Sequence, residues 1–226
     1  MYACSNASRR DRMTEIFLAN PRPGAPAAAE ATLRGHDAPA AGSKTVLNVG
    51  CGYPARQRLH KHFHGAEWRE IRLDIDPAVR PEIVCSMTDM CPVMSQSVDA
   101  VWSSHNLEHL HRHEVPSALG EIIRVLKPGG MLLLTLPDLQ QVAELVVADR
   151  LEDEAYLSPS GPVSALDMIF GHAPSLARGH AYMAHKTGFT LRSLQNLLAE
   201  TGFVDVRVKR GRAFDLWAAA HKPALG

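Results

Sequence analysis

Short apolar runs alternate with polar or helix-like segments along the chain beyond residue 44. The strand-like runs are TVLNV at 45–49, EIRLDI at 70–75, EIVCSM at 82–87, VDAVWSS at 98–104 and MLLLTL at 131–136. Continuous apolar runs of this length are typical of strands that are covered on both faces, as in a parallel sheet. The alternation therefore predicts a doubly wound α/β fold.

Two helices can be placed from their spacing and their end residues. Apolar residues recur at helical intervals over 115–126, and this helix should end at KPGG, because Pro128 cannot continue it and Gly129 can adopt the left-handed conformation. Thr190 is expected to cap the start of a later helix, with Gly202 just past its end.

The last two strand-like runs, 203–209 and 213–220, are separated only by RGR. They should pair antiparallel, because a parallel crossover needs about a dozen residues or more. The predicted fold is thus Rossmann-like: a doubly wound, mostly parallel sheet that ends in an antiparallel C-terminal hairpin.

The domain organisation follows from composition. Residues 1–43 form an N-terminal extension, with an amphipathic segment around RMTEIFLAN and an Ala/Pro-rich linker over about 20–42. Residues 44–226 are expected to form one domain. Within it, 138–187 shows no regular pattern, and we expect it to cap the carboxyl ends of the strands.

The composition of the chain argues against several classes of partner. The chain has 24 Lys and Arg against 24 Asp and Glu, so no sequence-wide charge attracts nucleic acid or an anionic membrane. No apolar run approaches the ~20 residues that span a bilayer, and the N-terminus lacks a signal-peptide core. The four cysteines show no zinc or disulfide spacing. We therefore expect a cytoplasmic protein without nucleic-acid or membrane partners; a homo-oligomer is compatible with the sequence.

An adenosine-ligand pocket is indicated by VLNVGCGYPA and the strand after it. Gly50 and Gly52 follow the first strand and precede 55–65, a predicted helix, so that the backbone can turn sharply and approach a ligand. Asp74 ends the second strand, where a carboxylate can accept both hydroxyl hydrogens of a ribose.

Two cofactor classes fit that pocket. GCGYPA satisfies the dinucleotide fingerprint G-x-G-x-x-G/A, so a nicotinamide-dependent oxidoreductase remains open. The terminal hairpin and the lack of a downstream substrate domain favour S-adenosylmethionine instead. That ligand has no pyrophosphate, so its site tolerates Tyr53 and Pro54.

Five motifs, in order, resemble the class I S-adenosylmethionine-dependent methyltransferases. They are LNVGCG, RLDIDP, SVDAVWSSHNLEHL, EIIRVLKPGGMLLLTLPD and HKTGFTLRSLQNLLAETGF. They are most similar to a bacterial predicted methyltransferase group, some of whose members lie near glycan biosynthesis. The resemblance covers about 44–220 and leaves the N-terminal extension out.

The resemblance implies a cofactor-binding set that runs along the carboxyl ends of the strands: Gly50, Cys51 and Gly52 at the methionine end, Asp74 at the ribose, Ile75 beside the adenine, Ser86 and Met87 after the third strand, and Ser103 and Ser104 near the sulfonium. Two positions depart from the family pattern. Asn48 replaces an acidic residue and Pro54 replaces a glycine. These departures keep open a relative that binds S-adenosylmethionine without catalysis.

Methyl transfer is an in-line displacement, so the protein mainly has to orient the acceptor and exclude water. An oxygen or nitrogen acceptor also loses a proton, which a neutral histidine can accept. His105 is our candidate for this role, and Tyr182 and His185 are candidates for the acceptor pocket.

The histidines of HNLEHLHRH at 105–113 would form a candidate metal site on a helix, since histidines four residues apart share a face. No cysteine or convergent carboxylate set accompanies them in the sequence, so we predict no metal and assign Glu108 no catalytic role. The expected function is methyl transfer from S-adenosylmethionine, giving S-adenosylhomocysteine, to a small-molecule or sugar acceptor. No N-P-P-Y-type sequence is present to hold a flipped base.

Overall fold

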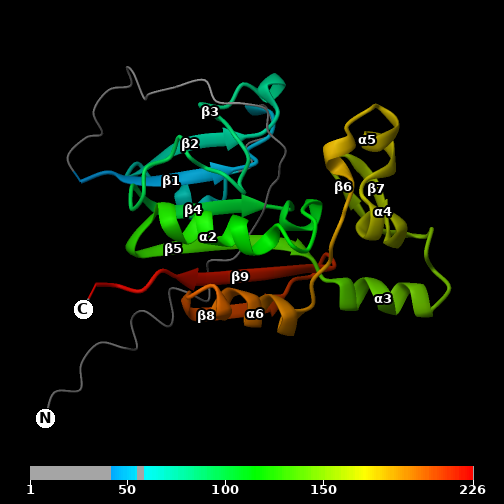
Figure 1. The fold of residues 1–226 in the computed structure, drawn as a ribbon. Coiled ribbons are helices and arrows are strands. Elements are labelled where there is room, and N and C mark those ends of the chain that lie inside the picture. The colour runs from blue at the N-terminus through cyan, green and yellow to red at the C-terminus, as the bar shows by residue number, and fades with distance from the viewer. Residues whose placement is uncertain (1–41, 55–58, 226) are drawn as a thin grey trace, which may run out of the picture.

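The computed structural model describes residues 42–54 and 59–225. Its centre is a seven-stranded sheet with the order β3-β2-β1-β4-β5-β9-β8 (Figure 1). The strands are β1 (Lys44–Val49), β2 (Trp68–Asp74), β3 (Ile83–Val84), β4 (Val98–Ser104), β5 (Leu126–Pro137), β8 (Val204–Arg210) and β9 (Asp215–His221). The predicted N-terminal extension, with its amphipathic segment and linker, lies almost entirely outside the described residues.

The strand directions confirm the predicted fold class. Strands β1 to β5 pair parallel, whereas β9 pairs antiparallel with both β5 and β8. Val49 is in register with Leu73 of β2 and with Ser103 of β4, so the carboxyl ends of three strands meet at one edge. Loops that leave this edge can therefore share one ligand.

Strand β3 is shorter than the predicted run 82–87. Only Ile83 and Val84 pair, at the outer edge of the sheet. Beyond them the chain turns inward: Ser86 and Met87 are buried, and the Ser86 hydroxyl bonds to Thr88 Oγ1 at 2.7 Å. Burial of Met87 in the core replaces continued pairing at the edge.

Helices α2 (Val115–Val125) and α6 (Leu191–Glu200) cover one face of the sheet (Figure 1). As predicted, the first ends just before KPGG, where Gly129 has φ +75°. Thr190 caps the second in a reciprocal arrangement with Ser193, and Gly202 has φ +98°. Thr190 therefore caps α6 as predicted, whereas α2 ends at its C-cap, Leu126, which is already extended, so that KPGG belongs to β5 and does not cap the helix.

The described part of the segment that covers the opposite face does not form the helix that we predict over 55–65. Residues 55–58 lie outside the described residues, and the rest of the predicted helix over 55–65 contains a single 3₁₀ turn, η2 (Lys61–Phe63). His60 and Phe63 pack on Trp102, with ring centroids 5.0 and 6.1 Å away. Burying these two rings under the sheet takes precedence over helical periodicity, so the prediction of a helix is wrong for its described part.

The segment 138–187 is regular, although its sequence shows no clear pattern. It contains α3 (Leu139–Val147), the hairpin β6 (Glu154–Ser158) and β7 (Gly161–Ser164), α4 (Ala165–Phe170), α5 (Ala173–Ala177) and η5 (Ala181–Met183). It has its own small apolar cluster, built around Val142 and Met168. These elements stand beyond the carboxyl ends of the parallel strands (Figure 1). None of the helices in the described chain has the length and apolarity to cross a bilayer.

Candidate active site

The turn after β1 is built on two glycines. Gly50 has φ +67° and Gly52 has φ +60°, a backbone region that is strained for most other residues. The N–H groups of Gly50 and Cys51 donate to the Leu73 carbonyl at 2.6 and 3.2 Å. The glycine turn is thereby fastened to the end of β2.

Asp74 completes this junction. Its Oδ2 accepts the Gly52 N–H at 2.9 Å and its Oδ1 accepts the Asp76 N–H at 3.0 Å. The residue is 9% exposed. The predicted glycine turn and the predicted ribose carboxylate therefore lie side by side. A narrow hollow here, without room for a water molecule, is lined by Val49, Gly50, Leu73, Asp74, Ile75, Cys85 and Met87.

Arg72 holds the same region together, and the sequence analysis missed it. Its guanidinium donates to the carbonyl oxygens of Gly52 at 2.7 Å, Val79 at 3.2 Å and Arg80 at 2.8 Å. It thus joins the glycine turn to the loop after β2. A single arginine within a strand carries no motif, so nothing in the sequence distinguished it.

Of the other predicted cofactor residues, Ile75 and Met87 line the hollow. Cys51 is buried beside the hollow, and this burial, together with the nearby Asp74 charge, raises the pKa of its thiol to about 12. The thiol therefore stays protonated. Ser86, Ser103 and Ser104 are not among the residues that line the hollow.

Asn48, one of the two departures from the family pattern, has a local explanation. Its side-chain amide donates to Glu70 Oε1 at 2.6 Å. An acidic residue at position 48 would bring two carboxylates together in a buried place, which costs free energy. Asn48 is therefore matched to Glu70 and does not by itself indicate a lost site.

Residues 105–113 do not form the helix on which the metal hypothesis was based. His105 has φ +54°, a 3₁₀ turn η4 (Leu107–His109) follows, and Leu110 is extended. His111 and His113 are exposed and stack on each other, with ring centroids 5.7 Å apart.

His105 lies at the end of β4, as predicted for the candidate base. Its Nδ1 is 3.4 Å from Glu108 Oε1, and its side chain is 44% exposed whereas that of Glu108 is 2% exposed. Burial alone would raise the pKa of Glu108, but interaction with His105 and with the nearby His109 and His185 lowers it. Glu108, which we gave no role, is thus a buried negative charge next to the candidate base.

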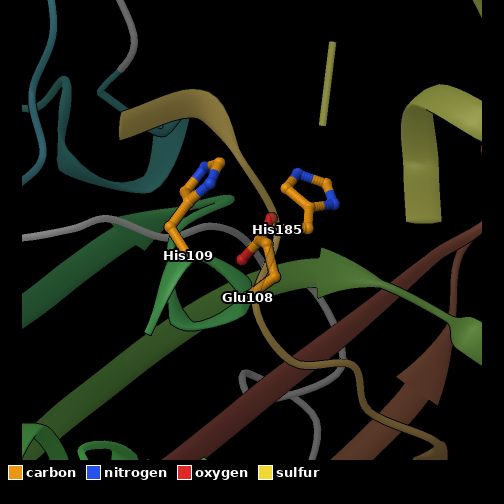
Figure 2. A group of neighbouring side chains, drawn as sticks. All are labelled: Glu108, His109 and His185. Carbon is orange, nitrogen blue, oxygen red and sulfur yellow. The ribbon is translucent and has the colours of Figure 1, made fainter. Parts of the chain in front are cut away.

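Two further histidines face the same carboxylate. His109 follows Glu108 in η4, and His185 comes from the loop before α6 (Figure 2). The two imidazole rings are 4.8 Å apart between centroids, and the carboxylate of Glu108 points toward the space between them. Because His185 is far away in sequence, no spacing rule could have connected it with η4.

A cavity of about 240 Å³ lies beside this group. It is lined by Glu108, Pro137, Leu139, Met168, Ile169, Phe170, His185, Lys186, Thr187 and Gly188. Of the two residues predicted for the acceptor pocket, His185 lines it. Tyr182 does not, and the residue is 53% exposed.

Comparisons with known proteins show what parts of this chain are similar to. Residues 47–134 match a family model described as a methyltransferase domain. A malonyl-[acyl-carrier protein] O-methyltransferase of a Methylovorus species is 32% identical over 81 residues, which is 36% of this chain and 26% of that protein. The chain thus matches about a quarter of the length of this curated relative.

Solved structures share the fold. A SAM-dependent methyltransferase from Methanosarcina mazei is 16% identical with a TM-score of 0.53, and the match covers 81% of this chain and 94% of that one. A possible exported protein from Bordetella parapertussis is 18% identical with a TM-score of 0.52, covering 80% and 62% respectively. At these identities the likeness concerns the fold alone.

Proposed function

We propose that this chain, which carries a class I S-adenosylmethionine-dependent methyltransferase domain, transfers the methyl group of that cofactor to a small-molecule or sugar acceptor. The domain agrees with the resemblance predicted from the five motifs. The observation that carries the proposal is the junction of the glycine turn with Asp74 at the carboxyl edge of the sheet.

The cofactor-binding part of the proposal is supported by the residues that surround the narrow hollow at this junction. Gly50, Asp74, Ile75 and Met87 all line it. Ile75 and Met87 offer apolar contact to an adenine ring, and Asp74 offers acceptor oxygens to ribose hydroxyls. The Gly50–Gly52 turn leaves room for close approach of the methionine end.

In the proposed reaction, an acceptor atom attacks the methyl carbon while the carbon–sulfur bond breaks and its electron pair stays on sulfur. The products are the methylated acceptor and S-adenosylhomocysteine. The acceptor's proton passes to His105, whose Nδ1 faces the Glu108 carboxylate. A carboxylate in this place orients the ring and stabilises the imidazolium once it has taken the proton.

The acceptor is proposed to enter the cavity between η4 and α4. Its volume of about 240 Å³ and its mixture of apolar and charged lining residues suit part of a small molecule. His185 contributes a polar contact there, whereas Tyr182 remains a proposal for the rim.

Calorimetry with S-adenosylmethionine, S-adenosylhomocysteine and NAD tests the cofactor. We expect both sulfur nucleosides to bind and NAD to fail; binding of NAD alone would favour an oxidoreductase. A screen of metabolite extracts with cofactor labelled in the methyl group then tests turnover. Binding without methyl incorporation into any extract would favour a binding-only relative.

A further inference from the structure

The structure assigns Glu108, His109 and His185 to one cluster, and we propose that it is a binding site for a divalent transition-metal ion. One nitrogen from each ring and one carboxylate oxygen all lie within 4.8 Å of one another (Figure 2). Two imidazoles and a carboxylate are a ligand set that suits Zn²⁺ and Fe²⁺ rather than Mg²⁺ or Ca²⁺. Our expectation of no metal rested on the lack of a convergent carboxylate, and Glu108 is now placed in that position.

The carboxylate of Glu108 is the first reason for this proposal. The residue is 1% exposed, and among the described residues neither of its oxygens has a hydrogen-bond partner. His105 Nδ1 lies 3.4 Å from Oε1. A buried charge is costly unless it is paired or binds a metal, and a carboxylate can face His105 with one oxygen and a cation with the other.

The orientation of the two histidines is the second reason. His109 Nδ1 lies 3.1 Å from the Ala184 carbonyl oxygen, and His185 Nδ1 lies 2.8 Å from that of Met168. A carbonyl oxygen can only accept, so each Nδ1 carries the hydrogen and each neutral ring has its lone pair on Nε2. Metal-binding histidines are typically oriented in this way, by a hydrogen bond from the other ring nitrogen to a backbone carbonyl.

The backbone fixes the three residues relative to one another. The Glu108 carbonyl accepts the N–H groups of Lys186 at 2.7 Å and Thr187 at 3.1 Å, and the His185 N–H donates to the Phe170 carbonyl at 3.1 Å. Metal–ligand bonds of about 2.1 Å place neighbouring ligand atoms roughly 3–3.5 Å apart. Side-chain rotations that move these atoms by about 1 Å therefore close the group around an ion.

The position of the cluster indicates what the metal would contact. Glu108 and His185 both line the cavity proposed for the acceptor. Three protein ligands leave at least one coordination position for water or substrate. We infer that the acceptor is an oxygen nucleophile bound there, because a metal ion lowers the pKa of a bound hydroxyl. This choice of acceptor rests on the proposed function, whereas the metal site does not.

Titration of Zn²⁺ alone into the untagged full chain, stripped of metal with a chelator, tests the site. Asparagine can replace either histidine with an amide nitrogen near the position of Nδ1, so His109→Asn and His185→Asn can keep the bond to the carbonyl while removing Nε2. Glu108→Gln keeps the shape of the third ligand and removes its charge. His113→Ala is the matched control, because it removes an exposed histidine of the same segment.

We expect one high-affinity Zn²⁺ equivalent in the wild type, accompanied by a rise in melting temperature. Each of the three ligand variants should weaken binding by about 100-fold or more, whereas His113→Ala should change it by less than about threefold. If Glu108→Gln does not melt cooperatively, the Zn²⁺ affinities of the two asparagine variants decide whether the site is present. No high-affinity binding in the wild type, or binding that all three ligand variants retain, would overturn the proposal.

Binding of S-adenosylhomocysteine is measured on the same samples to separate the two proposals. Nucleoside binding without the Zn²⁺ site leaves the proposed function standing and overturns the metal site. Zn²⁺ binding that depends on the three ligands, without nucleoside binding, supports the metal site and overturns the proposed function. Where both bind, loss of methyl transfer to a hydroxyl acceptor on chelation, with recovery on adding metal, supports activation of the acceptor by the metal, and unchanged transfer refutes that role.

Discussion

Replacing Asp74 by alanine tests the proposed ribose site. The carboxylate offers about four lone-pair positions, and backbone N–H groups of Gly52 and Asp76 use one on each oxygen. The remaining positions can accept the two ribose hydroxyls. We therefore expect the ligand and the loop to bind to Asp74 at the same time rather than to compete for it.

The expected loss of affinity follows from the charge of this acceptor. A hydrogen bond to a charged group contributes about 1.5–3 kcal/mol, and the hydroxyls regain water when the carboxylate is removed. Asp74→Ala should thus weaken S-adenosylhomocysteine binding by roughly 10- to 150-fold. The same variant loses the bonds to Gly52 and Asp76, which should lower the free energy of unfolding by about 1–3 kcal/mol.

Calorimetry with S-adenosylhomocysteine, which cannot turn over, measures the affinity, and urea denaturation measures the stability. Asp99→Ala is the matched control. Its carboxylate also accepts a backbone N–H, from Thr45 at 2.8 Å, but it lies at the amino end of β4. The control should lose stability and keep affinity. A folded Asp74→Ala protein that binds within threefold of the wild type would refute the ribose assignment.

Three other predictions concern different parts of the molecule. His105→Ala should lower kcat by roughly 100-fold or more while S-adenosylhomocysteine affinity stays within about twofold; equal losses in both would make His105 a packing residue. Gly171→Ala should lower stability by about 1–3 kcal/mol in urea denaturation, because Gly171 has φ +102° and a Cβ would overlap the Met183 carbonyl; Gly179→Ala, at φ +86° with open space, should cost less. Burial, together with nearby positive charges, lowers the pKa of His60 to about 4 from 6.5. The unfolded chain therefore binds this proton first, and the free energy of unfolding should fall as pH falls from 6.5 toward 4. His60→Phe should lose less stability than the wild type between pH 7 and 5, and an equal loss would contradict the assignment.

The sequence predicts the sheet well, because its strands and their connections are marked by residues that are close in the chain. Apolar runs mark the strands, and the connection RGR requires the antiparallel pair β8–β9. Gly50, Gly52 and Asp74 lie at the ends of two adjacent strands. Once the strand order is known, parallel pairing brings them to the same edge.

Where the sequence prediction failed, tertiary packing replaced a local preference. A helix was expected after the glycine turn, but His60 and Phe63 are buried under the sheet against Trp102. Likewise, 138–187 has short elements that pack on a small cluster of their own, around Val142 and Met168. Such elements are too short to show a clear period in the sequence.

The acceptor side of the site depends on contacts between residues far apart in the chain. Glu108 becomes a buried charge facing two histidines only because the loop at 184–187 returns to η4, where the Glu108 carbonyl binds two of its N–H groups. Sequence spacing cannot show this contact. The proposed cofactor end and the proposed acceptor end therefore have different origins: a local motif positions the first, and the elements beyond β5 position the second. Substitutions in 138–187 should accordingly change which acceptor is used while leaving the nucleoside site intact.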